Sequence, residues 1–220
     1  MPHFFIKSEN VSNNIVQISD TENYKHIAKA LRAKVGEKLL LIDESQIQYE
    51  TEIKDITSKE IIAEIKDKYK SKRFLDFELY LAQSPLRSEA QSVIIEKATE
   101  LGVTGVYPIF TDNCALTKDV IVKKIEKWQK TMYEASKQCE RAVVPTCFEM
   151  TTMDELLKSN RFDVVIAFCE RLSELTFRDY LKSNLELFNN KKVLVIIGPE
   201  GGFSEREFKF FKDNNIPMLT

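Results

Sequence analysis

The stretch Val193-Leu-Val-Ile-Ile197 runs directly into Gly198-Pro-Glu-Gly-Gly-Phe-Ser204. The first segment is continuously apolar, which is typical of a strand buried on both faces of a parallel sheet. The second holds three of the six glycines in the 220-residue chain. Ser204 and Glu207 have capping-box spacing, so a helix is predicted to follow. Ligands bind at this carboxyl edge of an open parallel sheet, where glycine lets the backbone approach them.

The side chains of this loop indicate which ligand it would accept. Glu200 places a carboxylate there, and the Lys-Ser/Thr ending of a P-loop is missing. That carboxylate disfavours a phosphate and tolerates a cationic ligand. S-adenosylmethionine fits, because it carries a sulfonium and an ammonium group and no phosphate. The alternative is a plain tight turn in which Glu200 is solvated or acts as a cap.

The residues upstream of this loop alternate between predicted strands and helices. Strands are expected at 77–82, 103–110, 164–168 and 193–197, with helices between them. This alternation predicts an α/β domain whose mainly parallel sheet is covered on both faces. Trp128, which has helical spacing with Ile121 and Met132, is expected in the core or in a dimer interface.

The first third of the chain is rich in short strand candidates. They are expected at 4–7, 15–18, 38–43, 47–54 and 60–65, with one helix at 24–33 opened by a capping box of Ser19 and Glu22. Strands this short and closely spaced predict a small β-barrel. The charged run 66–73 is expected to be a solvated linker, and beside an RNA-binding domain it would also be placed to contact phosphate.

Composition excludes several other classes of protein. The chain is 43% hydrophobic and 30% charged, so it can form a core, and its net charge of −2 does not by itself indicate a nucleic-acid partner. The four cysteines lack CxxC spacing and only two histidines are present, so no metal site is expected. With no membrane-length apolar run and no signal-peptide pattern at the N-terminus, a cytoplasmic location is expected.

Four sequence blocks, in order along the chain, resemble those of one enzyme family. GPEGGFS-x-x-E after VLVIIG is similar to the cofactor loop of RsmE-type SPOUT RNA methyltransferases, which methylate N3 of a uridine in 16S ribosomal RNA. The other blocks are His26-Ile-x-x-x-Leu-Arg32 with Gly36, Ile95-Glu-Lys-Ala-Thr-Glu-Leu-Gly-Val103 with Pro108, and Glu134-Ala-Ser-Lys-Gln-Cys-Glu-Arg141 with Pro145. The chain is therefore identified as a member of that family.

The resemblance implies an α/β protein with two domains. Residues 1–72 would form a PUA-like RNA-binding β-barrel, and residues 73–220 a SPOUT methyltransferase domain with an α/β trefoil knot. The second domain would form a homodimer, bind S-adenosylmethionine and act on the small ribosomal subunit. The residues implied for cofactor binding lie at two strand ends and in the glycine-rich loop: Phe168, Cys169, Glu170, Ile197, Gly198, Pro199, Glu200, Gly201 and Gly202.

Two cations are candidates for the chemistry on RNA. Arg141 is the first candidate for the catalytic cation that favours an anionic uridine, and Lys97 is the second. Both have a structural alternative. Arg141 would cap a helix end or pair with Glu140, and Lys97 would pair with Glu100 on its own helix.

Other polar residues are placed by the same blocks. Arg32 and Arg87 are expected to contact the RNA backbone, although Arg87, just before a helix, could also be idle. His26 is expected in the core or as a cap. No general base is assigned; Glu170 is possible, but it is expected to face the sulfonium or to cap.

The chain also departs from the family pattern. Family members continue past the position of Thr220 with a segment similar to LG-x-RILR-x-ETA, so we expect this 220-residue chain to have an incomplete knot and to bind cofactor weakly. Asn113 stands where the family has an arginine. Two alternatives therefore stay open: a non-catalytic RNA-binding or ribosome-assembly protein, and a nucleotide-binding α/β enzyme that holds phosphate in the loop.

Overall fold

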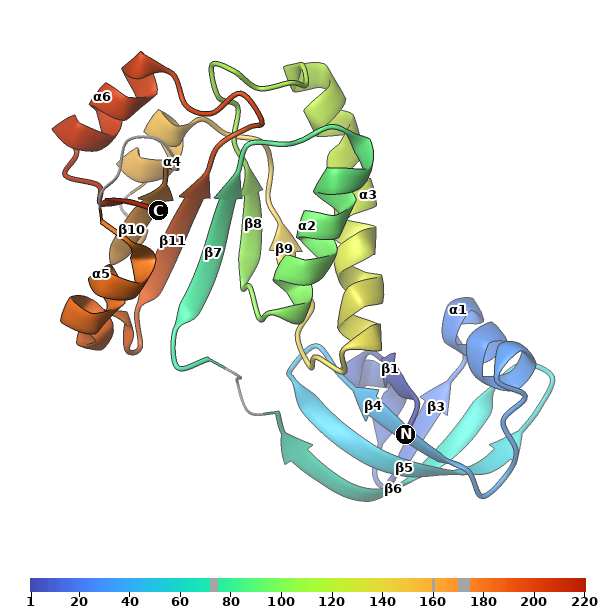
Figure 1. Cartoon of the computed structure of the whole chain (residues 1–220). Coiled ribbons are helices and arrows are strands. Elements are labelled where there is room, and N and C mark those ends of the chain that lie inside the picture. The colour runs from blue at the N-terminus through green and yellow to red at the C-terminus, as the bar shows by residue number, and fades with distance from the viewer. Residues whose placement is uncertain (72–74, 160, 170–174) are drawn as a thin grey trace. The chain divides into compact units, whose positions relative to one another are not determined.

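The computed structural model describes residues 1–71, 75–159, 161–169 and 175–220 (Figure 1). The chain divides into two compact units. Unit 1 comprises Met1–Lys72 together with Ser136–Val143, and unit 2 comprises Arg73–Ala135 together with Val144–Thr220. The segment Ser136–Val143, which begins inside a long helix, therefore belongs to unit 1.

Unit 1 is built on a six-stranded sheet in the order β1-β4-β5-β6-β3-β2. Only β1 and β4 are parallel neighbours among the described strands of this sheet. Two register shifts between β5 and β6 bend the ladder, and an apolar cluster that includes Val16, Leu41 and Ile53 fills the inside. The strands are β1 His3–Phe5, β2 Val11–Ser12, β3 Ile15–Ile18, β4 Lys38–Ile42, β5 Ile47–Ile56 and β6 Ile61–Lys70.

The N-cap of the first helix in unit 1 is one residue later in the sequence than predicted. The Asp20 side chain accepts from the Asn23 N–H at 2.9 Å, so Asp20 and not Ser19 caps α1, Thr21–Tyr24. The chain continues as the π-helix η2, Lys25–Ala30, where the Leu31 N–H donates to the His26 carbonyl. A further single turn, the 3-10 helix η1, spans Ser8–Asn10.

The sequence predicted a solvated linker at 66–73, but most of this charged run belongs to a strand. β6 continues to Lys70, which pairs with Ile47 of β5. Pairing with β5 satisfies the backbone hydrogen bonds of these residues, while their charged side chains remain in solvent. Residues 72–74 lie outside the described part of the chain.

Unit 2 contains a six-stranded sheet in the order β12-β10-β11-β7-β8-β9, with every described pair parallel. The strands are β7 Glu78–Gln83, β8 Gly105–Pro108, β9 Thr146–Cys147, β10 Val164–Phe168, β11 Lys192–Ile197 and β12 Met218–Leu219. The helices are α2 Ser88–Glu100, α3 Lys118–Gln138, α4 Met153–Lys158, α5 Phe177–Asn184, the 3-10 helix η3 Leu185–Phe188 and α6 Glu205–Asp213.

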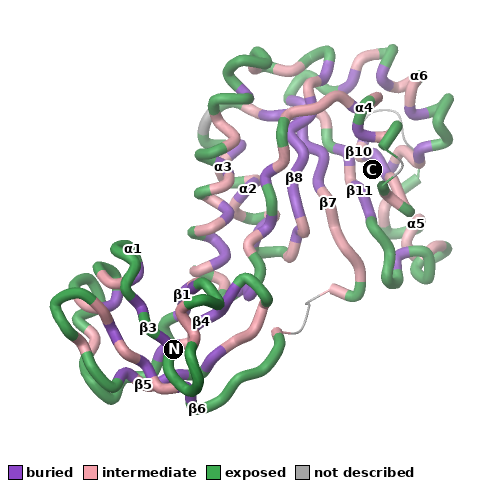
Figure 2. Tube along the Cα trace, turned by 180° about the vertical axis from the view of Figure 1, so that it is seen from behind, coloured by how far each residue is buried: buried purple, intermediate pink, exposed green. Residues whose placement is uncertain are grey.

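Helices cover both faces of this sheet, as the alternating pattern predicted. Leu81 packs with residues of α2 and α3, whereas its neighbour Ala82 packs with residues of α4 and α6. Val106 and Tyr107 of β8 divide between the same two clusters. Figure 2 shows the central strands of unit 2 as largely buried. The sheet is thus the middle layer of three.

The long helix α3 supplies much of one face. Trp128 is buried in the same cluster as Ile121 and Met132, which confirms the prediction that this helical stripe is core. Within the described residues, no helix is long and apolar enough to cross a membrane.

The connections of the sheet reverse direction between two adjacent strands. β7 leads through α2 to β8 on one side, and β11 leads through α6 to β12 on the other. β7 and β11 are direct neighbours, with Gln83 opposite Ile197. A parallel sheet has its topological switch point where such a reversal occurs, and ligands bind outside the carboxyl ends of those strands.

Candidate functional site

The ends of β7 and β11 are joined by hydrogen bonds at the switch point. The Ser84 N–H donates to the Ile197 carbonyl at 3.0 Å. The Gln83 side chain is 1% exposed, and its Nε2 donates to the carbonyls of Ser84 at 2.7 Å and Gly198 at 3.2 Å. These bonds fix the start of the glycine loop, residues 198–203, against the neighbouring strand.

The glycines of this loop serve its own packing and conformation. A Cβ added to Gly198 would lie 3.1 Å from the ring of Phe203, which is buried in the core of unit 2. Gly202 has a φ of +72°, which other residues adopt only with strain, and its N–H donates to the Pro199 carbonyl at 2.9 Å. The loop is therefore a tight turn whose shape depends on glycine.

Glu200 has a partner across the loop. Its Oε1 accepts from the backbone N–H of Arg87 at 3.2 Å, and Arg87 is the N-cap residue of α2. A carboxylate at a helix N-terminus is stabilised by the helix dipole. This position corresponds to the capping alternative for Glu200.

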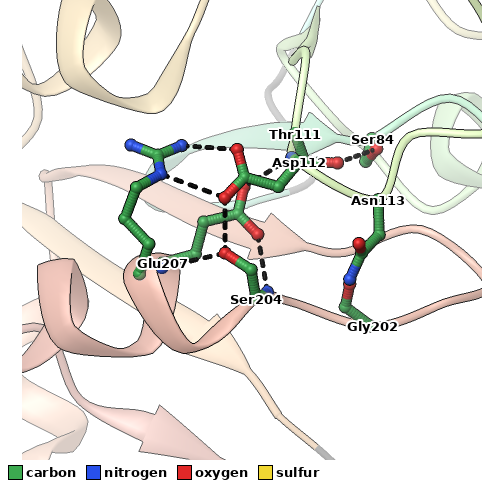
Figure 3. A network of polar contacts seen from close by, with 8 residues as sticks. Ser84, Thr111, Asp112, Asn113, Gly202, Ser204 and Glu207 are labelled. Carbon is green, nitrogen blue, oxygen red and sulfur yellow. Dashed lines mark hydrogen bonds and ion pairs between the residues drawn. The ribbon is translucent and has the colours of Figure 1, made fainter.

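A second loop, the β8 loop of residues 111–114, lies beside the glycine loop (Figure 3). The hydroxyls of Thr111 and Ser84 are buried and 2.7 Å apart, which ties this loop to the end of β7. The Asn113 side chain donates to the Gly202 carbonyl at 3.1 Å. Asn113 thus contacts the glycine loop directly.

The first turn of α6 completes the contact between the two loops. Arg206 binds Asp112 through two nitrogens, at 3.0 and 2.7 Å, and the Ser204 hydroxyl donates to the same carboxylate at 2.5 Å. The hydrogen bonds from Arg206, followed by that from Ser204, hold the pKa of Asp112 below its ordinary value. Behind them, the Glu207 carboxylate accepts from the N–H groups of both Asp112 and Ser204.

The electrostatics of these loops suit a cationic or neutral ligand better than a phosphate. Residues 198–204 contain no lysine or arginine. Arg206 follows in α6, but its guanidinium is engaged by Asp112, so it is not free to neutralise an anion. The loop itself therefore supplies no basic side chain for a phosphate, and its single carboxylate, Glu200, is compatible with the positively charged S-adenosylmethionine.

The strand β10 brings two of the other predicted cofactor residues to this edge. Phe168 is opposite Ile197 on one side and Leu219 on the other. Cys169 is buried, and burial raises the pKa of its thiol to about 11, so the thiol is neutral at physiological pH. Glu170 lies outside the described residues.

The predicted RNA-binding residues are divided between the two units. Arg87 and Lys97 belong to unit 2, and Arg32 and Arg141 to unit 1. Arg32 is exposed, with a φ of +53°, and Arg87 is exposed beside the glycine loop. Lys97 is also exposed, but its ammonium bonds to Glu96 and Glu100, as the structural alternative predicted.

Arg141 and His26 occupy environments that the sequence did not predict. Arg141 is only 9% exposed, and burial lowers the pKa of its guanidinium from the ordinary value. His26, expected in the core or as a cap, is instead exposed, with its ring edge-on to Phe4 at 5.3 Å between centroids. The next residue, Ile27, occupies the buried face of the same helix.

Three residues of the site were not singled out from the sequence: Gln83, Asp112 and Arg206. Their contacts join segments about a hundred positions apart, so no local spacing signals them. Glu207 was predicted as a capping residue, and that role is confirmed, but its bond to Asp112 has no sequence signature. Among the described residues, no group of three or more His, Cys, Asp or Glu side chains could hold a metal ion.

The fold and the site define an RNA methyltransferase. The chain matches the RNA methyltransferase domain family over residues 73–220, more than half of its length, and belongs to that family. Residues 18–66 match the RNA methyltransferase PUA domain. The chain thus combines a PUA-like domain with an α/β RNA methyltransferase domain, as the sequence resemblance implied.

Two proteins with similar sequences both have the name ribosomal RNA small subunit methyltransferase E. Ribosomal RNA small subunit methyltransferase E of Rickettsia conorii is 26% identical over 205 residues, 93% of this chain and 80% of the relative. The protein of that name from Aquifex aeolicus is 27% identical and covers 96% of this chain and 88% of its own. The crystal structure of the Neisseria gonorrhoeae enzyme bound to S-adenosyl methionine has the same fold, with a TM-score of 0.82, 21% identity and coverage of 100% and 88%.

Proposed function

We propose that this protein transfers a methyl group from S-adenosylmethionine to N3 of a uridine in the 16S ribosomal RNA of the small ribosomal subunit. Membership of the RNA methyltransferase family and the names of the relatives support this activity. The observation that carries the cofactor is the glycine loop at the switch point, where the nearby Arg206 is already engaged by Asp112. A loop at this place that lacks a basic side chain is compatible with a positively charged ligand.

The cofactor would be held by two strand ends and the glycine loop. These comprise Phe168, Cys169 and Glu170 after β10, and Ile197 with residues 198–202 after β11. S-adenosylmethionine supplies an electrophilic methyl group when it is bound. The chain's contribution is to orient that group in line with the target nitrogen, and orientation of two reactants can supply much of a rate enhancement.

The RNA must present an unpaired uridine whose N3 proton is lost. N3 is hydrogen-bonded inside a duplex, so the target is single-stranded or flipped out of its stack. A cation beside the base favours the uridine anion, and we assign this role to Arg141. An arginine keeps its charge in proteins even where burial lowers its pKa. Arg32, Arg87 and Lys97 would bind the RNA backbone.

The two domains predicted from the sequence would have different roles. Residues 1–72 would act as the RNA-binding barrel, and residues 73–220 as the methyltransferase domain, through which the protein would form a homodimer. A ribosomal RNA substrate would place the protein in the cytoplasm.

The activity is tested by incubating the purified protein with small ribosomal subunits that lack the modification. After addition of S-adenosylmethionine, the RNA is digested to nucleosides and analysed by mass spectrometry. We expect the amount of 3-methyluridine to increase during incubation, and to stay constant when the subunits already carry the methyl group. RNA binding without methyl transfer, or methylation of a different atom, would overturn the proposal.

A further inference from the structure

We propose that Glu207 is a positioning residue that fixes the glycine loop of the cofactor site against the neighbouring β8 loop. This inference rests on the proposed function, because that function gives the glycine loop its ligand. Glu207 lies in α6 and accepts hydrogen bonds from the backbone N–H of Asp112 in the β8 loop and from that of Ser204, which directly follows the glycine loop.

The Glu207 carboxylate is 0% exposed, and its two oxygens serve different segments. Oε2 accepts from the Ser204 N–H at 2.9 Å, which is the bond expected of a capping box. Oε1 accepts from the Asp112 N–H at 3.0 Å, in the loop after a different strand. A carboxylate can accept at both oxygens, whereas an amide has only one acceptor, so this position specifically requires an acid.

Further contacts run along the same junction (Figure 3). Asp112 receives the Ser204 hydroxyl and the Arg206 guanidinium on the exposed side. The Asn113 side chain donates to the Gly202 carbonyl, and a Cβ on Gly201 would lie 3.3 Å from the Cβ of Asn113. The β8 loop therefore packs closely along the second half of the glycine loop. The buried Glu207 carboxylate links the backbone of the β8 loop to that of Ser204, which follows the glycine loop.

This arrangement has a consequence for ligand affinity. The glycine loop has to be held in one conformation before it can bind the cofactor, and the β8 loop is the segment it packs against. A buried carboxylate that holds both backbones provides that order in advance, which lowers the entropic cost of binding. Loosening the junction should therefore weaken cofactor binding, while the chemistry of molecules that have bound it changes little.

The test compares Glu207→Gln with Glu205→Gln, an exposed position in the same helical turn. Gln preserves the volume of Glu207 but turns an NH2 group toward a backbone N–H. We expect the Kd for S-adenosylmethionine and for S-adenosylhomocysteine, measured by calorimetry, to rise roughly tenfold in Glu207→Gln. The KM for the cofactor should rise by the same factor, with kcat within about twofold of wild type. Glu205→Gln should match the wild type.

A merely structural role gives a different result. Partial unfolding would lower the number of active molecules, so kcat would fall while KM and Kd stayed unchanged, and that outcome would overturn the proposal. If Glu207→Gln does not fold, Glu207→Asp decides, because its shorter side chain keeps the carboxylate but does not reach the N–H groups of both Asp112 and Ser204. We expect the Kd to rise in that variant as well; an unchanged Kd would overturn the proposal.

Failure of the proposed function is recognised separately. Wild-type protein that bound neither ligand would overturn both the cofactor site and the role of Glu207 in it. Hydrogen exchange at the Asp112 N–H would still report the junction, since it should accelerate in Glu207→Gln and not in Glu205→Gln.

Discussion

The Gln83 side chain donates a hydrogen bond to the carbonyl of Gly198, 115 positions further along the chain, at 3.2 Å. This bond lies where β7 and β11 end side by side, and the same nitrogen also donates to the Ser84 carbonyl. A buried amide thus determines where the glycine loop leaves the sheet.

Replacing Gln83 with Met should destabilise unit 2. Met has a similar length and volume but cannot donate, so two buried carbonyls lose a partner at a cost of about 1–3 kcal/mol. Urea unfolding followed by circular dichroism measures the change. The control is Gln48→Met in unit 1, where the lost bond is to the Ser71 hydroxyl at a partly buried site. Equal costs at the two positions would contradict the prediction.

Replacing Gly198 with Ala should cost about 1–3 kcal/mol of unfolding free energy, because the added methyl group overlaps the Phe203 ring. Phe203→Leu should reduce that cost, since it removes the ring atoms concerned. Gly202→Ala provides the comparison: it has open space and only a positive φ, so its cost of about 1 kcal/mol should not depend on residue 203. A double-mutant cycle without coupling between positions 198 and 203 would contradict this explanation.

The ion pair of Asp112 and Arg206 should make stability depend on pH. The pKa of Asp112 in the folded protein is lowered from its ordinary value of 3.8, chiefly by Arg206. The stabilisation is therefore present above pH 3.8 and is lost as the pH falls through the lower folded pKa. Asp112→Asn should thus differ most from wild type near neutrality, and the two proteins should converge in acid. Urea titrations at several pH values measure this difference; a gap that persisted in acid would exclude the ion pair as its cause.

Arg141→Ala should reduce methyl transfer and leave cofactor binding unchanged. Loss of a cation that favours the uridine anion should lower kcat/KM for RNA by roughly tenfold or more. Because Arg141 is buried, thermal melting must first show that the variant is folded. Arg178→Ala, at an exposed position of α5, is the control. Normal methylation by a folded Arg141→Ala protein would assign this side chain to packing alone.

Local signals in the sequence predicted most of the fold. The apolar runs become β10 and β11, and the Ser204–Glu207 capping box opens α6 as expected. The errors occur where a tertiary contact decides. Pairing with β5 extends β6 into its charged run, and His26 lies exposed beside Phe4 instead of in the core.

The candidate site was predictable in part for the same reason. Three clustered glycines and Glu200 identify the loop from neighbouring residues alone. The bonds of Gln83 and Asp112 depend on which strands lie next to each other, and that order is a property of the whole sheet. Burial of Arg141 likewise follows from its place in unit 1, although most of α3 belongs to unit 2.

Calorimetric titration of the purified protein with S-adenosylmethionine, and separately with ATP, is the most direct measurement of the central claim. We predict saturable binding of S-adenosylmethionine at a single class of sites and no heat of binding with ATP, because residues 198–204 include Glu200 and no lysine or arginine that could bind a phosphate. Binding of ATP without S-adenosylmethionine would contradict the assignment of the glycine loop to a methyl donor.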